Sequence, residues 1–470
     1  MSGIGWKPGV LCLVAFLAVA RGAQSQSTSC VASPGTKPTL IALPERPNVL
    51  LVLLDDVGVD LPAVYAEGTK PAKTPVITSL AEQGVLFRNA WATPGCSPTR
   101  AMILTGRYPF RTGIGRAITY SNSPVEVPVD EYTIADSVRA AGYRAAIVGK
   151  WHLGSAAISG ATHALQLGFE HHRGSVENLP NEDGVNAYYH WDKDSDGAIA
   201  RCDNYATTEQ VNDALDQIAA WGDQPWFLWL AFNAPHAPYH VPPALLQPYT
   251  LPVDPLDDIP TAGRAMLAAV DKELGRLLHD MDPVVRARTY VIVAGDNGTS
   301  SELVLAPFLK GKAKASPYEG GVNVPLIVTG PGVAQDEECD APVSLVDLFA
   351  TIAELANSKA SAAIDSESLV PYFSDPALPP IRPWVYTEAF GPNGLTPTYP
   401  DDRRAVRDAR YKLIVWQKGQ PQLEQEFYDL WLDPWERSPL PLANLTEEQQ
   451  AAYDHSFAVM SEMRAWWTAR

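Results

Sequence analysis

The sequence predicts an α/β protein with a large, mostly parallel sheet covered by helices on both faces, followed by a smaller domain with an antiparallel sheet and one helix. Runs that are apolar at almost every position recur along the first three quarters of the chain, with helix-like stretches between them. Such runs are typical of strands buried on both faces, and strands that alternate with helices favour parallel pairing. Near the C-terminus, short strand-like segments follow one another directly, which favours an antiparallel sheet.

Each expected element follows from its local pattern. The apolar runs predict strands within residues 48–54, 143–152, 226–236, 290–297 and 324–330. The helical stretches lie at residues 74–84, 131–142, 207–221 and 261–281. In the C-terminal part, residues 405–416 and 426–430 are strand-like, and residues 446–467 predict a closing helix. We therefore expect a large domain over residues 46–375 and a smaller α+β domain over residues 376–470.

The composition is that of a globular protein with an acidic surface. The chain has 470 residues, of which 46% are apolar and 19% charged, so it can bury a sizeable core. Its formal net charge of −18 argues against nucleic acid as the main partner, because phosphate binding relies on a basic surface. A local basic pocket remains compatible with this total, since a small anion responds mainly to nearby charges.

The first 20 residues predict an export signal. Lys7 provides a positive charge, residues 10–20 (VLCLVAFLAVA) are apolar, and residues 18–20 form a small-x-small cleavage site. This apolar run is too short to cross a bilayer, so no membrane span is expected. Residues 21–45 predict a flexible leader. We therefore expect an exported protein that is periplasmic, secreted or lumenal.

Removal of that signal leaves four of the five cysteines, namely Cys30, Cys96, Cys202 and Cys339. In an oxidising compartment these four allow two disulfides with three alternative connectivities. If Cys96 has another fate, one bridge and one free thiol remain. The sequence does not choose the pair.

Charged, amide and imidazole side chains follow four of the predicted strands. They are Asp55, Asp56, Lys150, His152, Asn233, His236, Asp296 and Asn297. In open α/β sheets, ligands bind beyond the carboxyl ends of the strands. Four such strand ends therefore predict one shared site.

The segment PGCSPTR (residues 94–100) places a cysteine at the expected start of a helix. Pro98 suits a first helical turn and Ser97 its cap, so Cys96 is expected just before the helix N-terminus. Free backbone N–H groups there, together with Arg100, favour anion binding and a lowered thiol pKa. Two interpretations follow: covalent chemistry on an anionic substrate, or a buried or disulfide-bonded cysteine.

The sequence around Cys96 closely resembles the signature of type I sulfatases, because residues 96–100 read CSPTR and residues 104–107 read LTGR. Further motifs of the family follow in family order at residues 142–152 (GYRAAIVGKWH), 233–238 (NAPHAP), 296–298 (DNG) and 316–321 (SPYEGG). The resemblance extends from about residue 46 to the C-terminus. It implies an alkaline phosphatase-like fold with residues 46–375 as the catalytic domain. Gly95, Ala145 and Gly295 depart from the residue types usual in the family, without removing a chemical group.

The resemblance implies that Cys96 is converted before it acts. In the family, a formylglycine-generating enzyme oxidises this cysteine to Cα-formylglycine during maturation, and the signature arginine, here Arg100, holds the product. One hydroxyl of the hydrated aldehyde would attack sulfur, giving a covalent sulfate and releasing the alcohol. The implied activity is hydrolysis of a sulfate ester, in a sulfated small molecule or glycan, to an alcohol and inorganic sulfate.

The matching positions carry the other catalytic roles that the resemblance implies. His152 would take a proton from the second hydroxyl, which expels sulfate and restores the aldehyde. Lys150 and Arg100 would hold the hydrate, and Lys150 would also contact the substrate. His236 and Lys314 would bind the sulfate and protonate the leaving oxygen. Lys314 is preferred over the other nearby lysines because it fits the spacing K-x-x-x-Y-E-G-G.

The implied cofactor beside formylglycine is Ca²⁺. Hard cations take carboxylate and amide oxygens, and the group at Cys96 together with a sulfate oxygen would complete the shell. The absence of histidine from this ligand set argues against zinc. Taken alone, the aspartate pair after the first strand favours a turn or a helix cap, and the Asp-Asn pair at a second strand end shifts the interpretation to a metal site. The expected protein ligands are Asp55, Asp56, Cys96, Asp296 and Asn297.

Two weaker patterns accompany these motifs. Trp151, Tyr239 and His240 are expected to line the substrate pocket. Residues 192–203 imitate an EF-hand loop but lack its bidentate glutamate, so we expect an acidic hairpin there. A hairpin leaves the chain with a single predicted calcium site.

Three functions remain open from the sequence. The leading one is that of a sulfuric ester hydrolase, with aryl sulfates, sulfated monosaccharides and sulfated glycosaminoglycan ends all compatible as substrates. The second is that of a phosphomonoester or phosphodiester hydrolase of the same superfamily, although two-zinc phosphatases would show more histidine and aspartate ligands. The third is a non-catalytic protein that binds sulfated glycans if Cys96 stays a thiol.

Overall fold

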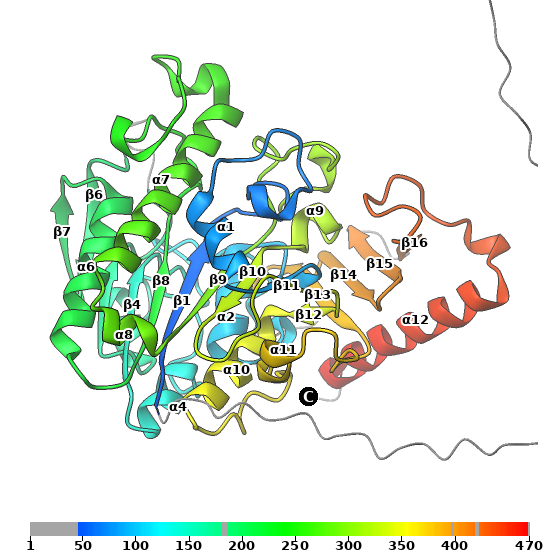
Figure 1. Cartoon of the computed structure of the whole chain (residues 1–470). Coiled ribbons are helices and arrows are strands. Elements are labelled where there is room, and N and C mark those ends of the chain that lie inside the picture. The colour runs from blue at the N-terminus through cyan, green and yellow to red at the C-terminus, as the bar shows by residue number, and fades with distance from the viewer. Residues whose placement is uncertain (1–45, 180–186, 396–398, 419–422, 469–470) are drawn as a thin grey trace, which may run out of the picture. The chain divides into compact units, whose positions relative to one another are not determined.

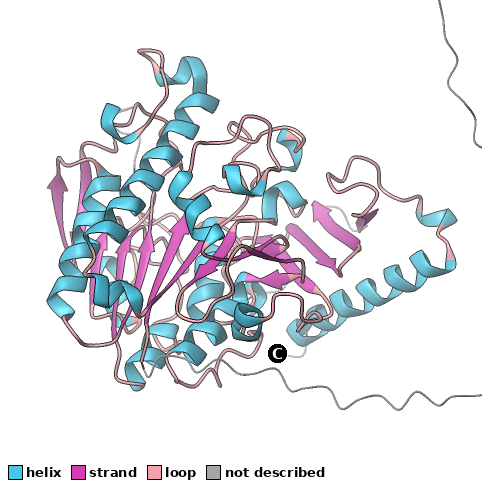
Figure 2. Cartoon of the chain, in the orientation of Figure 1, coloured by secondary structure: helices cyan, strands magenta, loops and turns pink. Residues whose placement is uncertain are grey.

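The computed structural model describes residues 46–179, 187–395, 399–418 and 423–468 (Figure 1). The expected signal, the expected leader and Cys30 lie outside the described residues. Within them, the chain forms a ten-stranded sheet, a two-stranded pair and a four-stranded sheet, with helices packed around them (Figure 2). The predicted fold class, a large mostly parallel sheet with a smaller antiparallel sheet, is confirmed.

The ten-stranded sheet carries the site. Its five central strands pair in parallel, and antiparallel strands flank them on both sides. At the centre, Leu50 lies opposite Leu228 on one side and Val291 on the other. In spatial order the strands are β11 (Glu337–Cys339), β2 (Gly84–Phe87), β10 (Leu326–Thr329), β9 (Thr289–Gly295), β1 (Asn48–Leu54), β8 (Trp226–Ala231), β4 (Arg144–Gly149), β5 (His171–Gly174), β6 (Trp191–Ser195) and β7 (Ala198–Cys202).

Side chains of β1 alternate between two cores, one on each face of this sheet. Leu50 and Val52 pack in the core under α1 (Pro75–Glu82), α6 (Ala206–Trp221) and α7 (Ile259–Asp280). Leu51 and Leu53 pack in the core under α2 (Cys96–Thr105), α4 (Ile134–Ala140) and α10 (Leu348–Leu355). Successive strand residues point to opposite faces, so a run that is apolar throughout requires helices on both sides.

Side-chain caps set two helix starts that the apolar pattern placed differently. α4 is shorter than the predicted 131–142, because Thr133 and Asp136 form a capping box that starts the helix at Ile134. α7 begins before the predicted residue 261, because the Asp258 side chain accepts a hydrogen bond from the backbone N of Thr261 at 3.2 Å.

The C-terminal part forms the expected antiparallel sheet. The predicted strand over residues 405–416 is divided by a turn, in which the Asp408 side chain accepts hydrogen bonds from the backbone N atoms of Arg410 (2.7 Å) and Tyr411 (2.6 Å). The closing helix α12 (Glu447–Thr468) packs on the two central strands of this sheet. The strands are β13 (Val385–Gly391), β14 (Asp401–Arg407), β15 (Tyr411–Lys418) and β16 (Glu424–Asp429).

Residues 192–203 fold as the predicted acidic hairpin, formed by β6 and β7. Asp194 points inward from this hairpin, accepting from the backbone N of Gly197 at 2.8 Å and contacting Nδ1 of His172 at 2.7 Å. Its carboxylate is therefore already paired, and the segment does not form an EF-hand loop.

Two further features concern the expectations about membrane spans and disulfides. Among the helices of the described ranges, none is both long and apolar enough to cross a membrane. Within the same ranges, Cys96, Cys202 and Cys339 all carry free thiols.

Glu388 on β13 is fully buried and makes stability depend on pH. Its carboxylate accepts hydrogen bonds from the backbone N of Phe110 (2.7 Å) and the hydroxyl of Tyr386 (3.1 Å), with Arg404 and Asp402 as neighbouring charges. Burial raises the pKa of Glu388 from 4.5 to about 7. Between these values the folded state binds more protons than the unfolded chain, so the stability due to this group is complete below pH 4.5 and is lost as the pH rises through 7.

Replacing Glu388 with Gln should therefore flatten the pH dependence of the unfolding free energy. Relative to the variant, the wild type should lose about 3 kcal/mol between pH 5 and pH 8, as a shift of this size implies. Urea denaturation at both pH values measures the difference. Glu354→Gln, at an exposed position on α10, is the matched control and should keep the wild-type pH dependence. An equal pH dependence in Glu388→Gln and the wild type would contradict this assignment.

Candidate active site

The carboxyl ends of four parallel strands and the N-terminus of α2 bring the predicted site residues together. Asp55 and Asp56 follow β1, Lys150 follows β4, and Asp296 follows β9. The first residue of α2 is Cys96. β1, β4 and β9 are near neighbours in the sheet, so side chains far apart in the sequence meet at one edge.

The backbone is unusual at two of these strand ends. Gly149, the last residue of β4, has φ +100°, and a Cβ atom there would lie 1.9 Å from the carbonyl oxygen of Ala231. Only glycine permits this approach of β4 to β8. Asp56 and His152 adopt left-handed conformations with φ +62° and +61°. Such conformations are uncommon outside glycine and concentrate at functional sites.

Arg100 links the helix to two strand ends. Its guanidinium donates to Oδ2 of Asp296 from Nε (3.1 Å) and Nη2 (2.7 Å), and to the backbone carbonyl of Lys150 from Nη1 (2.7 Å). The ammonium of Lys150 pairs with Oδ2 of Asp55. All four side chains are fully buried, so these charges interact in a region that water does not screen.

A second cluster forms around Asp56. Its Oδ1 accepts a hydrogen bond from Nδ2 of Asn297 at 2.9 Å and pairs with the ammonium of Lys314. Its Oδ2 lies 3.9 Å from Nε2 of His236, whose Nδ1 donates to the carbonyl of Ala237 at 2.7 Å. His236 and Lys314 are partly exposed, so this cluster forms the solvent side of the site.

The charges set the protonation of these groups. Burial opposes ionisation of Asp55 and Asp56, but Lys150 beside the first and Lys314 beside the second hold the pKa of each carboxyl below its usual value. Burial and the charge of Asp55 raise the pKa of Asp296, against the pull of Arg100. Despite burial, Asp56 raises the pKa of Lys314, so that lysine is a cation at neutral pH. The site is therefore a dense set of paired opposite charges.

The start of α2 differs from the expectation in two ways. Gly95 occupies the cap position and Cys96 is the first helical residue, so Ser97 is not the cap. The Ser97 hydroxyl instead donates to the carbonyl of His152 (2.8 Å) and accepts from the backbone N of Ile118 (3.0 Å). The expected lowering of the thiol pKa is also wrong, because burial raises the pKa of Cys96 against the nearby lysines.

His152 is held as a neutral imidazole with one defined lone pair. Its Nε2 lies 2.9 Å from the carbonyl of Ile118, which only accepts hydrogen bonds, so Nε2 carries the proton. Its Nδ1 is buried without a hydrogen-bond partner in the described chain. Burial, with Lys150 and Arg100, lowers the pKa of His152 well below 6.5. An unprotonated Nδ1 at neutral pH suits a general base.

The oxygen atoms at the strand ends fit a divalent cation. Asp55 Oδ1 and Asn297 Oδ1 are buried and have no hydrogen-bond partner among the described residues. Potential ligand atoms of Asp55, Cys96 and Asp296 lie within 4.8 Å of one another, as do those of Asp55, Asp56 and His236. Orphaned buried oxygens beside carboxylates are typical of a hard-cation site. The sequence predicted His236 in the same site as a contact of the sulfate, and not beside the expected cation ligands.

A cavity of about 340 Å³ opens at this site. Cys96, His236 and Lys314 line it, together with side chains that the sequence did not single out: Asn178, Arg116, Asp401 and Arg403. These four come from loops and from β14, which carry no motif. The expected lining residues Trp151, Tyr239 and His240 are absent from its wall and buried elsewhere, where Tyr239 bonds Ser300 and His240 stacks on Tyr188.

Comparison with known families agrees with this geometry. The model of the Sulfatase family matches residues 47–358, and that of the N-sulphoglucosamine sulphohydrolase C-terminal region matches residues 313–459. The first match covers more than half of the chain. The chain therefore belongs to the sulfatase family.

Two curated relatives illustrate the similarity. N-acetylgalactosamine-6-sulfatase of Sus scrofa is 30% identical over 367 residues, which cover 70% of this chain and 66% of that protein. The chain thus spans just under two thirds of the length of that relative. The ulvan-active sulfatase of Formosa agariphila is 27% identical over 422 residues, which cover 84% of this chain and 77% of that protein.

The fold also matches solved structures. The structure of Ps i-CgsB in complex with k-i-k-neocarrahexaose has a TM-score of 0.72 at 22% identity, covering 90% of this chain and 93% of that chain. The match extends over both the ten-stranded and the four-stranded sheets, since it covers nine tenths of the chain. At this identity it establishes the common fold.

Proposed function

We propose that this protein hydrolyses sulfate esters to an alcohol and inorganic sulfate. The observation that carries the proposal is the position of Cys96, the first residue of α2, with its Sγ within 4.8 Å of carboxylate oxygens of Asp55 and Asp296 and beside the buried cations Arg100 and Lys150. Membership of the sulfatase family supports it. We further propose residues 46–375 as the catalytic domain and residues 376–470 as a C-terminal subdomain.

The proposed cofactors are Ca²⁺ and a formylglycine made from Cys96 by a formylglycine-generating enzyme. Asp55, Asp56, Asp296 and Asn297, with the group at position 96, would hold the cation. The two orphaned oxygens, Asp55 Oδ1 and Asn297 Oδ1, support this assignment. When both are present, they supply a nucleophilic oxygen and a positive charge at the sulfuryl group.

The surrounding side chains orient and neutralise the site. Arg100 is fixed by three hydrogen bonds to the ends of two strands, so it can position the group at residue 96 without rearrangement. Lys150, buried against Asp55, adds a second fixed positive charge on the same side. Lys314 and His236 line the cavity and are the proposed contacts of the sulfate oxygens.

Proton transfer requires one acceptor and one donor in this arrangement. The unprotonated Nδ1 of His152 would accept a proton from a hydroxyl at position 96, because its Nε2–H is committed to Ile118. Lys314 is a cation on the opposite, solvent-facing side and would donate toward the leaving oxygen, with His236 beside it. The two roles thus lie on separate segments, because His152 follows β4 and Lys314 lies in the loop before residue 319.

The proposed substrate is a sulfated glycan or a fragment of one. The names of the relatives, N-acetylgalactosamine-6-sulfatase and ulvan-active sulfatase, support this class. The cavity of about 340 Å³ is of a size that accommodates a sugar ring. We also propose that the protein is exported, because residues 1–20 have the pattern of a signal.

The proposal is tested with matched substrates and by mass spectrometry. The purified enzyme should turn over p-nitrophenyl sulfate and leave p-nitrophenyl phosphate largely intact. The peptide that contains position 96 should carry the mass of formylglycine, and metal analysis should find one calcium per chain. A phosphate preference with bound zinc, or an unmodified Cys96 in active enzyme, would contradict the proposal.

A further inference from the structure

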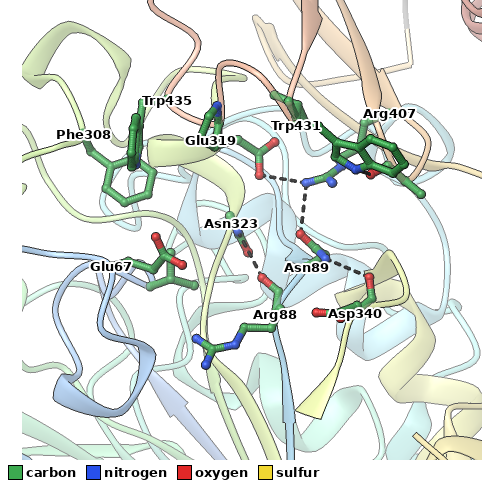
Figure 3. Close-up of a pocket in the computed structure, with 14 residues that line it drawn as sticks. Glu67, Arg88, Asn89, Phe308, Glu319, Asn323, Asp340, Arg407, Trp431 and Trp435 are labelled. Carbon is green, nitrogen blue, oxygen red and sulfur yellow. Dashed lines mark hydrogen bonds and ion pairs between the residues drawn. The ribbon is translucent and has the colours of Figure 1, made fainter. Parts of the chain in front are cut away.

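A second cavity, of about 510 Å³, lies apart from the proposed active site. It is walled by the loop after β2, by α9 (Glu319–Val322) and by the segment after β16 (Figure 3). None of its lining residues lines the cavity at Cys96. The segment 314–323 separates the two, since Lys314 faces the first cavity and Asn323 the second.

Aromatic side chains stand on two sides of this cavity. Figure 3 shows Phe308 and Trp435 close together on one side and Trp431 on the other. Trp431 is 69% exposed, which is high for so large an apolar side chain. Aromatic side chains combine a flat apolar face with low flexibility, and exposed ones concentrate at recognition surfaces.

The positive charges of the cavity are already neutralised. Arg88 binds Glu338 through Nε at 2.7 Å and donates to the carbonyl of Tyr65 at 2.8 Å. Arg407 donates from Nη1 to Glu319 at 3.1 Å. Neither guanidinium is therefore presented as a site for a sulfate or a carboxylate.

Three other polar side chains of the cavity offer acceptor atoms. Asn323 Oδ1 is buried and has no hydrogen-bond partner in the described chain. The carboxylates of Glu67 and Asp340 also line the cavity, and no described side chain or backbone N–H donates to them. Burial raises the pKa of Glu67, in line with its place in the wall. The cavity thus offers three uncompensated acceptors and a surplus of negative charge.

A matching ligand has apolar faces, several hydrogen-bond donors and no negative charge. A pyranose ring without sulfate or carboxylate has these properties, since its C–H faces pack on indole rings and its hydroxyls donate to carboxylate and amide oxygens. We propose that this cavity is a non-catalytic binding site for an unsulfated sugar unit of a glycan. The inference goes beyond the proposed hydrolysis and does not depend on it.

Such a site would hold a glycan chain through a unit that the enzyme does not attack. The acceptor-rich wall repels sulfated units, so the cavity would select units that carry free hydroxyls or a free amine. A sulfated polymer with unsulfated stretches would then be bound at two places on one protein, which raises its effective local concentration.

The test measures sugar binding by the full-length Cys96→Ala protein, which removes turnover. The probes are tetrasaccharides of glucose, galactose, mannose and N-acetylglucosamine, the amine-bearing glucosamine tetrasaccharide, and a sulfated galactose tetrasaccharide, all titrated by calorimetry. The sulfated probe can also occupy the active site, so its affinity should not depend on Trp435 or Glu67, whereas at least one unsulfated probe should bind at the second cavity. Trp435→Ala and Glu67→Gln should each weaken this binding by about tenfold or more, as loss of one anchoring contact does.

Controls separate this site from the active site and from folding. Glu354→Gln should leave the affinity unchanged, and Glu67→Gln in the otherwise wild-type protein should keep full turnover of p-nitrophenyl sulfate. If Glu67→Gln strongly weakens the affinity for the amine-bearing probe alone, the cavity binds an amino sugar. If it weakens the affinity for the neutral probes to a similar extent, the cavity recognises sugar hydroxyls. The inference is overturned if no unsulfated probe binds, if Trp435→Ala and Glu67→Gln weaken the sulfated probe more than the unsulfated ones, or if Trp435→Ala alters only the sedimentation of the protein, as an interface between copies would require.

Discussion

Replacement of Cys96 with Ala should lower kcat for p-nitrophenyl sulfate by about 10⁵-fold or more, which is the scale of loss when a nucleophile is removed. The side chain is 2% exposed and begins α2 beside Arg100, so no neighbouring side chain occupies an equivalent position. Steady-state turnover of purified protein, with urea denaturation to confirm that the variant is folded, measures the effect.

The matched control for this variant is Cys339→Ala. Cys339 is also buried and free, but it lies on β11 at the edge of the sheet, away from the active-site cavity. It should keep wild-type turnover and lose only the stability that a small buried side chain provides. Substantial turnover by Cys96→Ala would show that the reaction does not pass through position 96.

Asp296→Ala should remove activity, lower the cation content and destabilise the fold together. Asp296 accepts two hydrogen bonds from Arg100, and both side chains are fully buried. Removing one partner leaves the guanidinium charge buried and unpaired, which costs about 3–5 kcal/mol. Turnover, metal analysis and urea denaturation of the same preparation measure the three effects.

Two further variants, Asp296→Asn and Asp271→Asn, distinguish the loss of activity and cation from the loss of stability. Asn at position 296 keeps the shape and one acceptor oxygen, so it should fold better than the alanine variant while still losing activity. Asp271 is a buried carboxylate on α7 that accepts from the backbone N of Val76 (3.1 Å) and of Ile77 (2.8 Å). Asp271→Asn should reduce stability and keep the cation. Full calcium content in Asp296→Ala would refute the ligand assignment.

Much of the fold could be predicted because the signal is local. β8 and, after Asn48, β1 are apolar, both strands are buried throughout, and the two cores beside β1 follow from alternation along a single strand. Helix starts were predicted less well where a cap decided them, as at Thr133 and Asp258. A cap depends on one side chain, whereas an apolar stripe averages over many residues.

The candidate site was predicted where a motif coincided with a strand end. Asp55, Asp296 and Lys150 all follow central strands, and the parallel order of those strands brings them together. The role of Ser97 was predicted wrongly, because its hydroxyl bonds residues at positions 118 and 152 rather than its own helix. The raised pKa of Cys96 also depends on burial, which no neighbour in sequence reveals.

The sequence by itself determined the central strands β1, β4, β8 and β9, their polar ends and the resemblance to the family, because each of these is written in consecutive residues. Only the tertiary structure decided which loops wall the two cavities. It also decided that Arg88 and Arg407 are paired with glutamates. Among the described residues, His152 Nδ1 and Asn323 Oδ1 have no hydrogen-bond partner. These properties depend on pairs as distant as Arg88 and Glu338, 250 residues apart. The order of strands in the sheet sets such pairs, and no local pattern encodes that order.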